Sequence, residues 1–567
     1  MAQRTENYNP LRTTQRAPRS CRSCASRKVK CDKAVPCSTC IKRGEADACT
    51  REIVIIRGQV TSFNVSPAFR WKNAPHIPTY EELSVENQRL RQEAEHLRSD
   101  HGRIIQHWPS WKSARAEHDE EGLEDRLWDS LSAAWTATGS SVSTWDDVVL
   151  PSPACSDQLI AYDKMWNLWA HYAVEYPRFQ EECNNFMTAV ERGLSLEKAD
   201  PSWMAVYFSV ISAALLMMED DEAERLMLPE GLDRRKMSRI CYDAAIFALS
   251  RADFMRVPSI HTVQAIAVLG MCFNNWGDVE VGQHMWSSAL RIARRIGLNT
   301  PYSHAASSLS AEAQHRLWWT LVICEWLDLA YRPPAVDDVD FDVPLPCAAS
   351  PDAGEDNRVH YHIFMARTAT VVYRFRATIR SGLRSLHDIA RVVRNADEEL
   401  AAIIDTLPTH LQPDIDDVEN EELRRLQIAQ PWLRWQRYDL TLVLLHLRLR
   451  IHRTLQTQWL LSPGEYNWAR TVYVSSAMSV IWINRNWDQP ASMRKQWAIS
   501  YHIFVSAILL LHECQSEQAA DVEEYYEALQ TALSLLEDVK SWNALAFHAA
   551  AILRENMNSS GLVTDAL

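Results

Sequence analysis

Six cysteines lie within the first 49 residues at spacings that suit metal ligation. They follow the pattern C-x2-C-x6-C-x5-C-x2-C-x8-C and are Cys21, Cys24, Cys31, Cys37, Cys40 and Cys49. Cysteine thiolates are soft ligands that favour tetrahedral zinc, and each tetrahedral ion takes four of them. Six sulfurs cannot supply two separate four-sulfur sites, so two ions would have to share two bridging thiolates. The spacing therefore predicts a binuclear zinc cluster with two Zn²⁺ ions per chain.

The residues around these cysteines resemble the binuclear zinc cluster of fungal transcription factors. The resemblance rests on two segments, Cys24-Ala-Ser-Arg-Lys-Val-Lys-Cys31-Asp32 and Pro36-Cys37-Ser-Thr-Cys40. It implies that Cys21 and Cys37 bridge the two ions and that Lys28 contacts bases at the end of a first short helix. It also implies binding to CGG triplets, one per subunit, in the major groove. Ala25 stands where the family often carries Arg or Lys, which should weaken the hold on phosphate more than the choice of base.

Basic residues between and beside the cysteines are the candidates for contact with double-stranded DNA. Because lysine and arginine reach guanine O6 and N7 in the commonest specific contact, Lys28 is the first candidate for base recognition and Arg27 the second. Phosphate contacts fix register and orientation. The candidates for phosphate contact are Arg22, Lys30, Lys42 and Arg43. The alternative is a scaffold with a structural zinc module, but repulsion among these basic side chains argues for a bound polyanion.

Charge is distributed unevenly along the chain. The 567 residues carry a net charge of -14, yet residues 1–60 contain 13 Arg and Lys against 5 Asp and Glu, which gives +8 there and -22 in the remainder. Phosphate repels a surface with the sign of that remainder. The asymmetry predicts that base contacts are confined to the N-terminal region, preceded by a disordered basic tail at 1–20.

The composition favours a large helical body. Glycine is scarce at 15 residues and tryptophan is abundant at 22, which suits long, bulky helices more than a turn-rich β fold. Between residues 148 and 555 the apolar pattern is almost continuously helical. The clearest helices are expected at 261–273, 280–296, 311–331, 432–454 and 522–540. Gly297 should end the second of these. The uncharged stretch 201–218 is interpreted as a buried core helix rather than a membrane span.

Residues 80–105 carry a heptad repeat that predicts a coiled coil. Its d positions are Leu83, Leu90, Leu97 and Ile104. Asn87 lies at an a position, where it favours a parallel two-stranded register because it pairs with itself only in aligned helices. The pairs Glu86 with Arg91 and Glu93 with Arg98 are opposite in charge, which favours a homodimer. A solvated single helix is the alternative, since so short a coil is marginal alone.

Three further segments are expected to connect or end these parts: a proline-containing linker at 50–79, an acidic linker at 106–147 and a tail at 556–567. Within the acidic linker, residues 119–131 interleave acidic and bulky apolar side chains. We interpret them as linker or peripheral helix. A coactivator-binding surface is the alternative interpretation.

A second resemblance lies in the body. His315–Trp326, Arg332–Val336 and Asp342–Pro346 are similar to the middle homology region of the same fungal regulators. Tyr331 stands where that family commonly has glycine before the Arg-Pro pair, so a positive φ there is not expected. The resemblance implies an all-α regulatory domain over 148–555.

The other class of function considered is an all-α, metal-dependent enzyme. Asp220–Glu224 and Asp337–Asp342 could pass for the aspartate-rich magnesium sites of terpenoid synthases, which need carboxylates on facing helices. The first run lies where an apolar helix ends and the second in a loop, and the chain has no phosphate-binding glycine motif. We therefore expect a nuclear, sequence-specific regulator of RNA polymerase II genes and not an enzyme. Its expected partners are DNA, a second copy, and coactivators or an effector of the helical domain, with no membrane.

Overall fold

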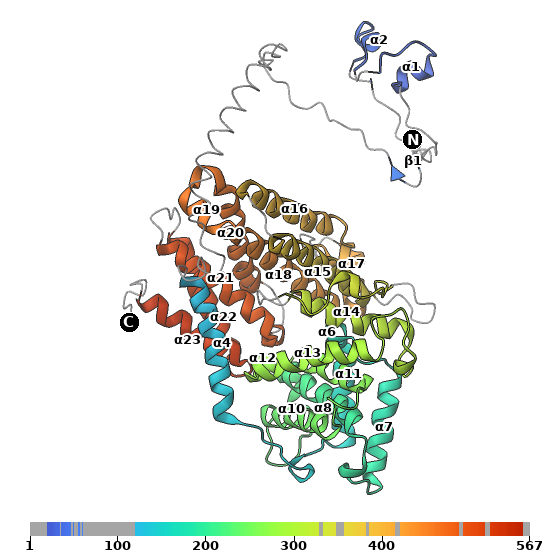
Figure 1. The fold of residues 1–567 in the computed structure, drawn as a ribbon, viewed down its shortest axis with the longest axis vertical. Helices are drawn as coiled ribbons and strands as arrows, with labels where there is room; N and C mark the ends of the chain where they lie inside the picture. Colours follow the sequence, from blue (N-terminus) through green and yellow to red (C-terminus); the bar gives the residue numbers. More distant parts are fainter. Residues whose placement is uncertain are drawn as a thin grey trace, which may run out of the picture. The chain divides into compact units, whose positions relative to one another are not determined.

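The computed structural model describes most of the chain after residue 119 and the cysteine-rich segment before it. The described residues are 20–33, 36–46, 49, 55–56, 59–60, 119–327, 333–347, 357–381, 385–413, 420–486, 491–515 and 522–559. The chain divides into two compact units, residues 1–109 and residues 110–567. The first contains the six cysteines, and the second is a large helical body (Figure 1).

The described residues of the first unit form two short helices and a small hairpin. Its elements are α1 (Arg22–Ser26), α2 (Ser38–Ile41), β1 (Ile55–Ile56) and β2 (Gln59–Val60). The two strands pair antiparallel, with Ile55 opposite Val60. The heptad segment at 80–105 lies outside the described residues, as do Leu83, Asn87, Leu90 and Leu97. The coiled coil and the homodimer therefore stay predictions.

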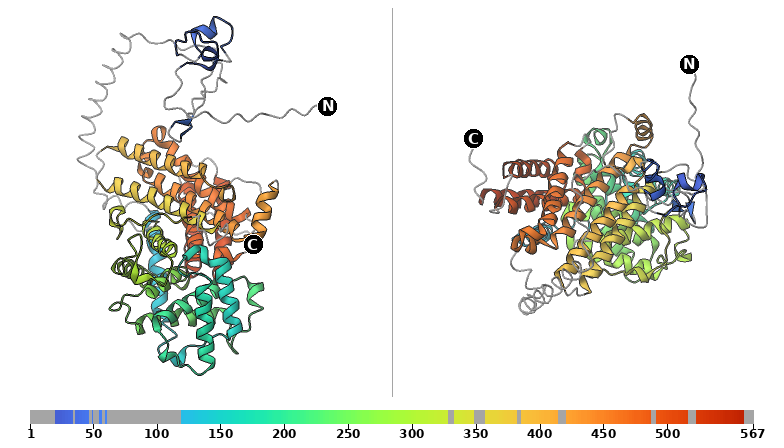
Figure 2. Two further views of the ribbon diagram at one scale, coloured as in Figure 1. Left: turned by 90° about the vertical axis from the view of Figure 1, so that its right-hand side faces the viewer. Right: turned by 90° about the horizontal axis from the view of Figure 1, so that it is seen from above.

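The second unit is a body of packed helices (Figures 1 and 2). Its α-helices are α4 (Asp119–Thr138), α5 (Pro153–Tyr162), α6 (Leu168–His171), α7 (Arg178–Glu191), α8 (Pro201–Met217), α9 (Asp220–Ala223), α10 (Arg234–Arg251), α11 (Ile260–Leu269), α12 (Phe273–Trp276), α13 (Val279–Arg295), α14 (Ala311–Leu327), α15 (Arg358–Arg380), α16 (Leu386–Asp405), α17 (Glu421–Ala429), α18 (Trp432–Arg453), α19 (Gln456–Leu461), α20 (Pro463–Asn486), α21 (Trp497–Gln515), α22 (Val522–Val539) and α23 (Ala544–Ser559). Short 3-10 turns are η2 (Trp145–Asp147), η4 (Leu196–Lys198), η5 (His304–Ala306), η6 (Asp338–Asp340), η7 (Thr409–Leu411) and η8 (Ala491–Lys495), and η3 (Asp163–Asn167) is a π-helix. The predicted fold class, a small cysteine-rich unit with a large all-α body, is confirmed.

Local sequence signals account for several helix ends. Gly297 follows α13 with a φ of +82°, and the Leu298 N–H donates to the Ala293 carbonyl at 2.9 Å, which is a glycine C-cap. The helix expected at 261–273 ends earlier, at the end of α11. Gly270 follows it, and a Cβ there would lie 2.9 Å from the ring of Trp286. Close packing thus selects glycine at this position, and glycine disfavours continuation of a helix.

Helix α8 forms the centre of the part of the body that lies below in Figure 1, with α10 and α11 packed along it. Every residue in Met204–Met217 is buried, so the interpretation of 201–218 as a core helix is confirmed. Sequence reasoning overlooked a second apolar helix, α21. By length and composition it is the described helix that could cross a membrane, but 78% of its apolar window is buried inside the body.

The segment expected to be an acidic linker at 106–147 contains a helix of the body. Helix α4 packs against α13, α21 and α23, and Figure 1 shows it in cyan beside the C-terminal helices. Leu127 and Leu131 are fully buried, and the carboxylate of Glu124 is enclosed by Arg450 and Arg453. These apolar side chains are occupied by packing within the body. They do not form the exposed row that a coactivator-binding surface would need.

Candidate metal centre and nucleic-acid interface

Two of the cysteines begin the two short helices of the first unit. Cys21 is the N-cap of α1, and its Sγ accepts the Cys24 N–H at 3.3 Å. Cys37 is the N-cap of α2, and its Sγ accepts the Cys40 N–H at 3.4 Å. Each C-x2-C pair therefore presents two sulfurs on one side of a helix N-terminus, because three residues of helix make almost one turn.

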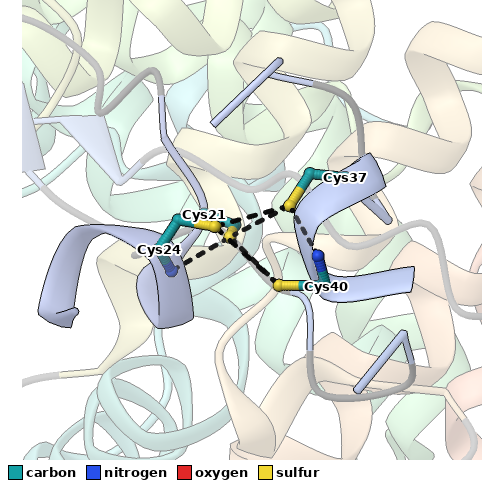
Figure 3. A group of neighbouring side chains, drawn as sticks. All are labelled: Cys21, Cys24, Cys37 and Cys40. Carbon is teal, nitrogen blue, oxygen red and sulfur yellow. Dashed lines mark hydrogen bonds between the residues drawn. The ribbon is translucent and has the colours of Figure 1, made fainter. Parts of the chain in front are cut away.

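The four sulfurs converge between the two helices (Figure 3). The Sγ–Sγ distances are 3.8 Å for Cys21 to Cys37, 3.8 Å for Cys21 to Cys40, 3.5 Å for Cys24 to Cys37 and 4.0 Å for Cys24 to Cys40. A Zn–S bond of about 2.3 Å in a tetrahedral site places sulfurs about 3.8 Å apart. The donor set and its spacing therefore fit zinc.

The remaining two cysteines lie beside this group. Cys49 is buried, and its Sγ accepts the Cys37 N–H at 3.2 Å. Cys31 is half-buried, and its sulfur lies within 4.8 Å of ligand atoms of Asp32 and Cys37. Cys37 thus belongs to both neighbouring groups of potential ligands. Burial and the neighbouring thiols raise the pKa of Cys24 to about 12, so this thiol should lose its proton as metal binds.

Residues 21–29 and residues 37–45, the two halves of the cysteine-rich segment, have the same local fold. They are related by an offset of 16 residues, which is the separation of Cys21 and Cys37. The Val29 N–H donates to the Cys24 carbonyl at 3.1 Å, and the Glu45 N–H donates to the Cys40 carbonyl at 3.0 Å. Each helix ends at a left-handed residue. These residues are Lys28, with a φ of 55°, and Gly44, with a φ of 71°.

The basic residues singled out from the sequence all lie on the surface of this unit. Those exposed are Arg22, Arg27, Lys28, Lys30, Lys42 and Arg43. Arg27, Lys28 and Lys30 lie at or after the end of α1, and Lys42 and Arg43 lie after the end of α2. Sequence reasoning missed the acidic partner of one: Arg27 Nη2 lies 2.5 Å from Glu45 Oε2. No local signal pointed to this pair, because its partners belong to different halves of the unit.

Two more polar contacts join the halves. The Ser38 N–H donates to Asp32 Oδ2 at 2.9 Å, and Thr39 Oγ1 donates to the Lys30 carbonyl at 3.0 Å. Both contacts connect the segment after α1 to α2. The residues on either side of Cys31 are thereby held to α2.

The acidic runs proposed as magnesium sites make other contacts. Asp220 forms ion pairs with Arg234 at 2.5 Å and Lys495 at 3.4 Å. Asp337 and Asp340 form a capping box at the start of η6, in which each side chain accepts the backbone N–H of the other residue. Within the described ranges, groups of three or more potential metal ligands occur only in the cysteine-rich unit, at Cys21, Cys24, Cys37 and Cys40 and at Cys31, Asp32 and Cys37.

The motif around Trp318 in the body holds α14 against the segment 333–347. Trp319 Nε1 donates to the Pro344 carbonyl at 2.9 Å, and Trp326 Nε1 donates to the Val336 carbonyl at 2.9 Å. Trp318 itself is fully buried. These residues stabilise the helical body. Tyr331 and Arg332 lie outside the described residues.

Comparison with known proteins matches both units. Residues 19–54 match the fungal Zn(2)-Cys(6) binuclear cluster domain, and residues 166–429 match the fungal specific transcription factor domain. The first unit is therefore a zinc-binding domain. An uncharacterized transcriptional regulatory protein of Schizosaccharomyces pombe is 24% identical over 382 residues, which cover 59% of this chain and 58% of the relative. The C6 finger domain transcription factor hasF of Aspergillus fumigatus is 23% identical over 348 residues, which cover 55% of this chain and 43% of the relative.

The matched regions thus span about half the length of these relatives. Among solved structures, a chain in "Structure of the K. lactis CBF3 core" aligns with a TM-score of 0.52 at 14% sequence identity. The alignment covers 79% of this chain and 92% of that chain. At this identity the likeness concerns the fold alone.

Proposed function

Because the chain belongs to the fungal binuclear zinc cluster transcription factors, we propose that it is a nuclear regulator of RNA polymerase II genes that binds DNA sequence-specifically. As a homodimer it recognises CGG-type triplets, one per subunit, in the major groove. The observation that carries this proposal is the set of exposed basic side chains beside the converging cysteine sulfurs.

Lys28 is the main base-contacting residue in this proposal. Its φ of 55° is unusual for a residue other than glycine, and the equivalent position after α2 is Gly44. The presence of lysine in a conformation that favours glycine supports a role for the side chain itself. The exposed ammonium group donates hydrogen bonds to guanine O6 and N7, while Arg22, Lys30, Lys42 and Arg43 bind phosphates.

Six cysteines hold two zinc ions, with Cys21 and Cys37 as the shared ligands. The support is their position: each is the N-cap of its helix, their sulfurs lie 3.8 Å apart, and Cys37 also belongs to the second group of potential ligands with Cys31 and Asp32. Zinc supplies the cross-links that fold the two halves onto one another. The cysteines thereby fix the surface on which the basic side chains stand.

The coil at 80–105 joins two copies in parallel through Leu83, Asn87, Leu90 and Leu97. The helical body regulates transcription and makes no base contacts, because its net negative charge opposes binding to phosphate. Coactivators or an effector of the body are the further partners in this proposal.

The test is binding of the zinc-loaded full chain to duplexes that contain CGG triplets or a scrambled sequence, measured by fluorescence anisotropy. The proposal predicts preference for CGG, lost on treatment with a chelator. Equal affinity for both duplexes would refute sequence-specific recognition. Magnesium-dependent turnover of a prenyl diphosphate by the same preparation would favour the enzyme instead.

A further inference from the structure

We propose that Glu45 is a positioning residue for DNA binding, which competes with DNA phosphate for the guanidinium of Arg27. The inference rests on the proposed function of the first unit. In the free protein, Arg27 Nη2 lies 2.5 Å from Glu45 Oε2, and the two side chains remain 38% and 37% exposed. A phosphate can therefore reach the same guanidinium from solvent.

The chemistry of the pair makes the carboxylate a mimic of phosphate. A guanidinium group presents its donors in a planar fork that fits carboxylate and phosphate oxygens alike. Arg27 directly precedes Lys28, the proposed base-contacting residue. Glu45 occupies the Nη2 donor of Arg27, so a phosphate that binds through this donor displaces the carboxylate.

The internal repeat of the unit shows that the local fold does not require this ion pair. At the offset of 16 residues, Arg43 is the equivalent of Arg27 and Val29 is the equivalent of Glu45. Arg43 is exposed and makes no ion pair with any described residue. Even so, the hydrogen bonds of the Lys28 and Val29 N–H groups after α1 recur at Gly44 and Glu45 after α2. The backbone is therefore repeated in the two halves, whereas the ion pair forms at Arg27 and Glu45 and has no counterpart at Arg43 and Val29. Arg43 is a natural control for an arginine without an internal competitor.

The expected effect is modest because the pair is exposed. Ion pairs of this kind shift an equilibrium by about 1.4- to 5-fold. Removing the competitor with Glu45→Gln should tighten binding by that factor to CGG and scrambled duplexes alike, because phosphate contacts carry no sequence information. This inference assigns Arg27, the second candidate for base contact from the sequence, to phosphate. Because Arg27 then binds phosphate in the complex of either variant, the salt dependence should keep the same slope.

The decisive experiment is a double-mutant cycle in the zinc-loaded full chain, with anisotropy titrations of the wild type, Glu45→Gln, Arg27→Ala and the double variant. Zinc content measured for each variant verifies that the unit remains assembled. We expect most of the gain from Glu45→Gln to disappear in the Arg27→Ala background. An equal gain in both backgrounds would assign the effect to the lost negative charge and overturn the inference, as would an absent gain or weaker binding.

The same titrations separate this inference from the proposed function. Preference of the wild type for CGG, combined with zero coupling in the cycle, would reject the role of Glu45 while retaining DNA recognition. A wild type that binds neither duplex would reject the proposed function and this inference with it. As a matched control, Arg43→Ala should weaken binding by the same factor with or without Glu45→Gln.

Discussion

Glu124 of α4 joins the first helix of the body to its C-terminal helices through a buried ionic contact, and its neutralisation should destabilise the body strongly. The carboxylate is paired with Arg450 at 2.9 Å and Arg453 at 2.6 Å, and it accepts the Tyr501 hydroxyl at 2.7 Å. The residue is only 8% exposed. Glu124→Gln keeps the shape of the side chain and removes the charge, which leaves both arginines without their carboxylate.

The magnitude follows from the pKa of Glu124. Burial alone would raise this pKa, but Arg450 and Arg453, with the Tyr501 hydrogen bond, lower it from 4.5 to about 2. A shift of that size corresponds to about 3 kcal/mol in the free energy of unfolding. Loss of one partner from a buried ion pair typically destabilises by roughly 3–5 kcal/mol, which agrees.

The sign of the pH dependence follows from the lowered pKa. The contribution of Glu124 is fully present above pH 4.5 and is lost as the pH falls toward 2, because the unfolded chain takes up the proton first. The difference between wild type and Glu124→Gln should therefore be about 3 kcal/mol at pH 7 and roughly 1–2 kcal/mol near pH 3.

Denaturant unfolding of the full chain, followed by tryptophan fluorescence, measures this difference. The matched control is Glu555→Gln, because Glu555 pairs with Arg126 of the same helix but both side chains are about half exposed. Its effect should stay below about 1 kcal/mol. Equal destabilisation by the two variants at pH 7, or a difference that does not change with pH, would refute the assigned role of Glu124.

The remaining predictions concern the first unit. Lys28→Ala should reduce discrimination between CGG and scrambled duplexes by on the order of 1–3 kcal/mol, whereas Arg43→Ala should weaken both and lower the salt slope by about one; equal losses on all sequences would contradict this division. Native mass spectrometry of the full chain should show about two zinc ions per subunit, and a stable single-zinc species would exclude shared thiolates. Asn87→Leu should stabilise the coil but loosen its register, while Leu90→Pro should abolish dimers in sedimentation; an unchanged dimer after Leu90→Pro would remove the coil from the model.

The features that were predictable from sequence depend on residues close together in the chain. Cysteine spacing predicted that sulfurs gather, because each C-x2-C pair lies across one helical turn, and the structure brings together the sulfurs of Cys21, Cys24, Cys37 and Cys40. Gly297 marked the end of α13 because a left-handed C-cap selects glycine. Long apolar periodicity gave the helices of the body.

The features that were missed depend on contacts between distant residues. Glu124 was interpreted as part of a linker or peripheral helix, and its burial was missed because the arginines that enclose it come more than 300 residues later. The Arg27–Glu45 pair was missed for the same reason, because its two residues come from different halves of the folded repeat. The local sequence pattern does not indicate which charged side chains are brought together by tertiary packing.

Selection of bound sequences from random duplex DNA by the zinc-loaded full chain tests the central claim most directly. The account predicts enrichment of CGG triplets by the wild type, the same triplet for a truncation that ends at residue 110, and loss of that enrichment in Lys28→Ala. Selection of no common sequence, or of a triplet that differs between the full chain and the truncation, would contradict base recognition by the first unit alone.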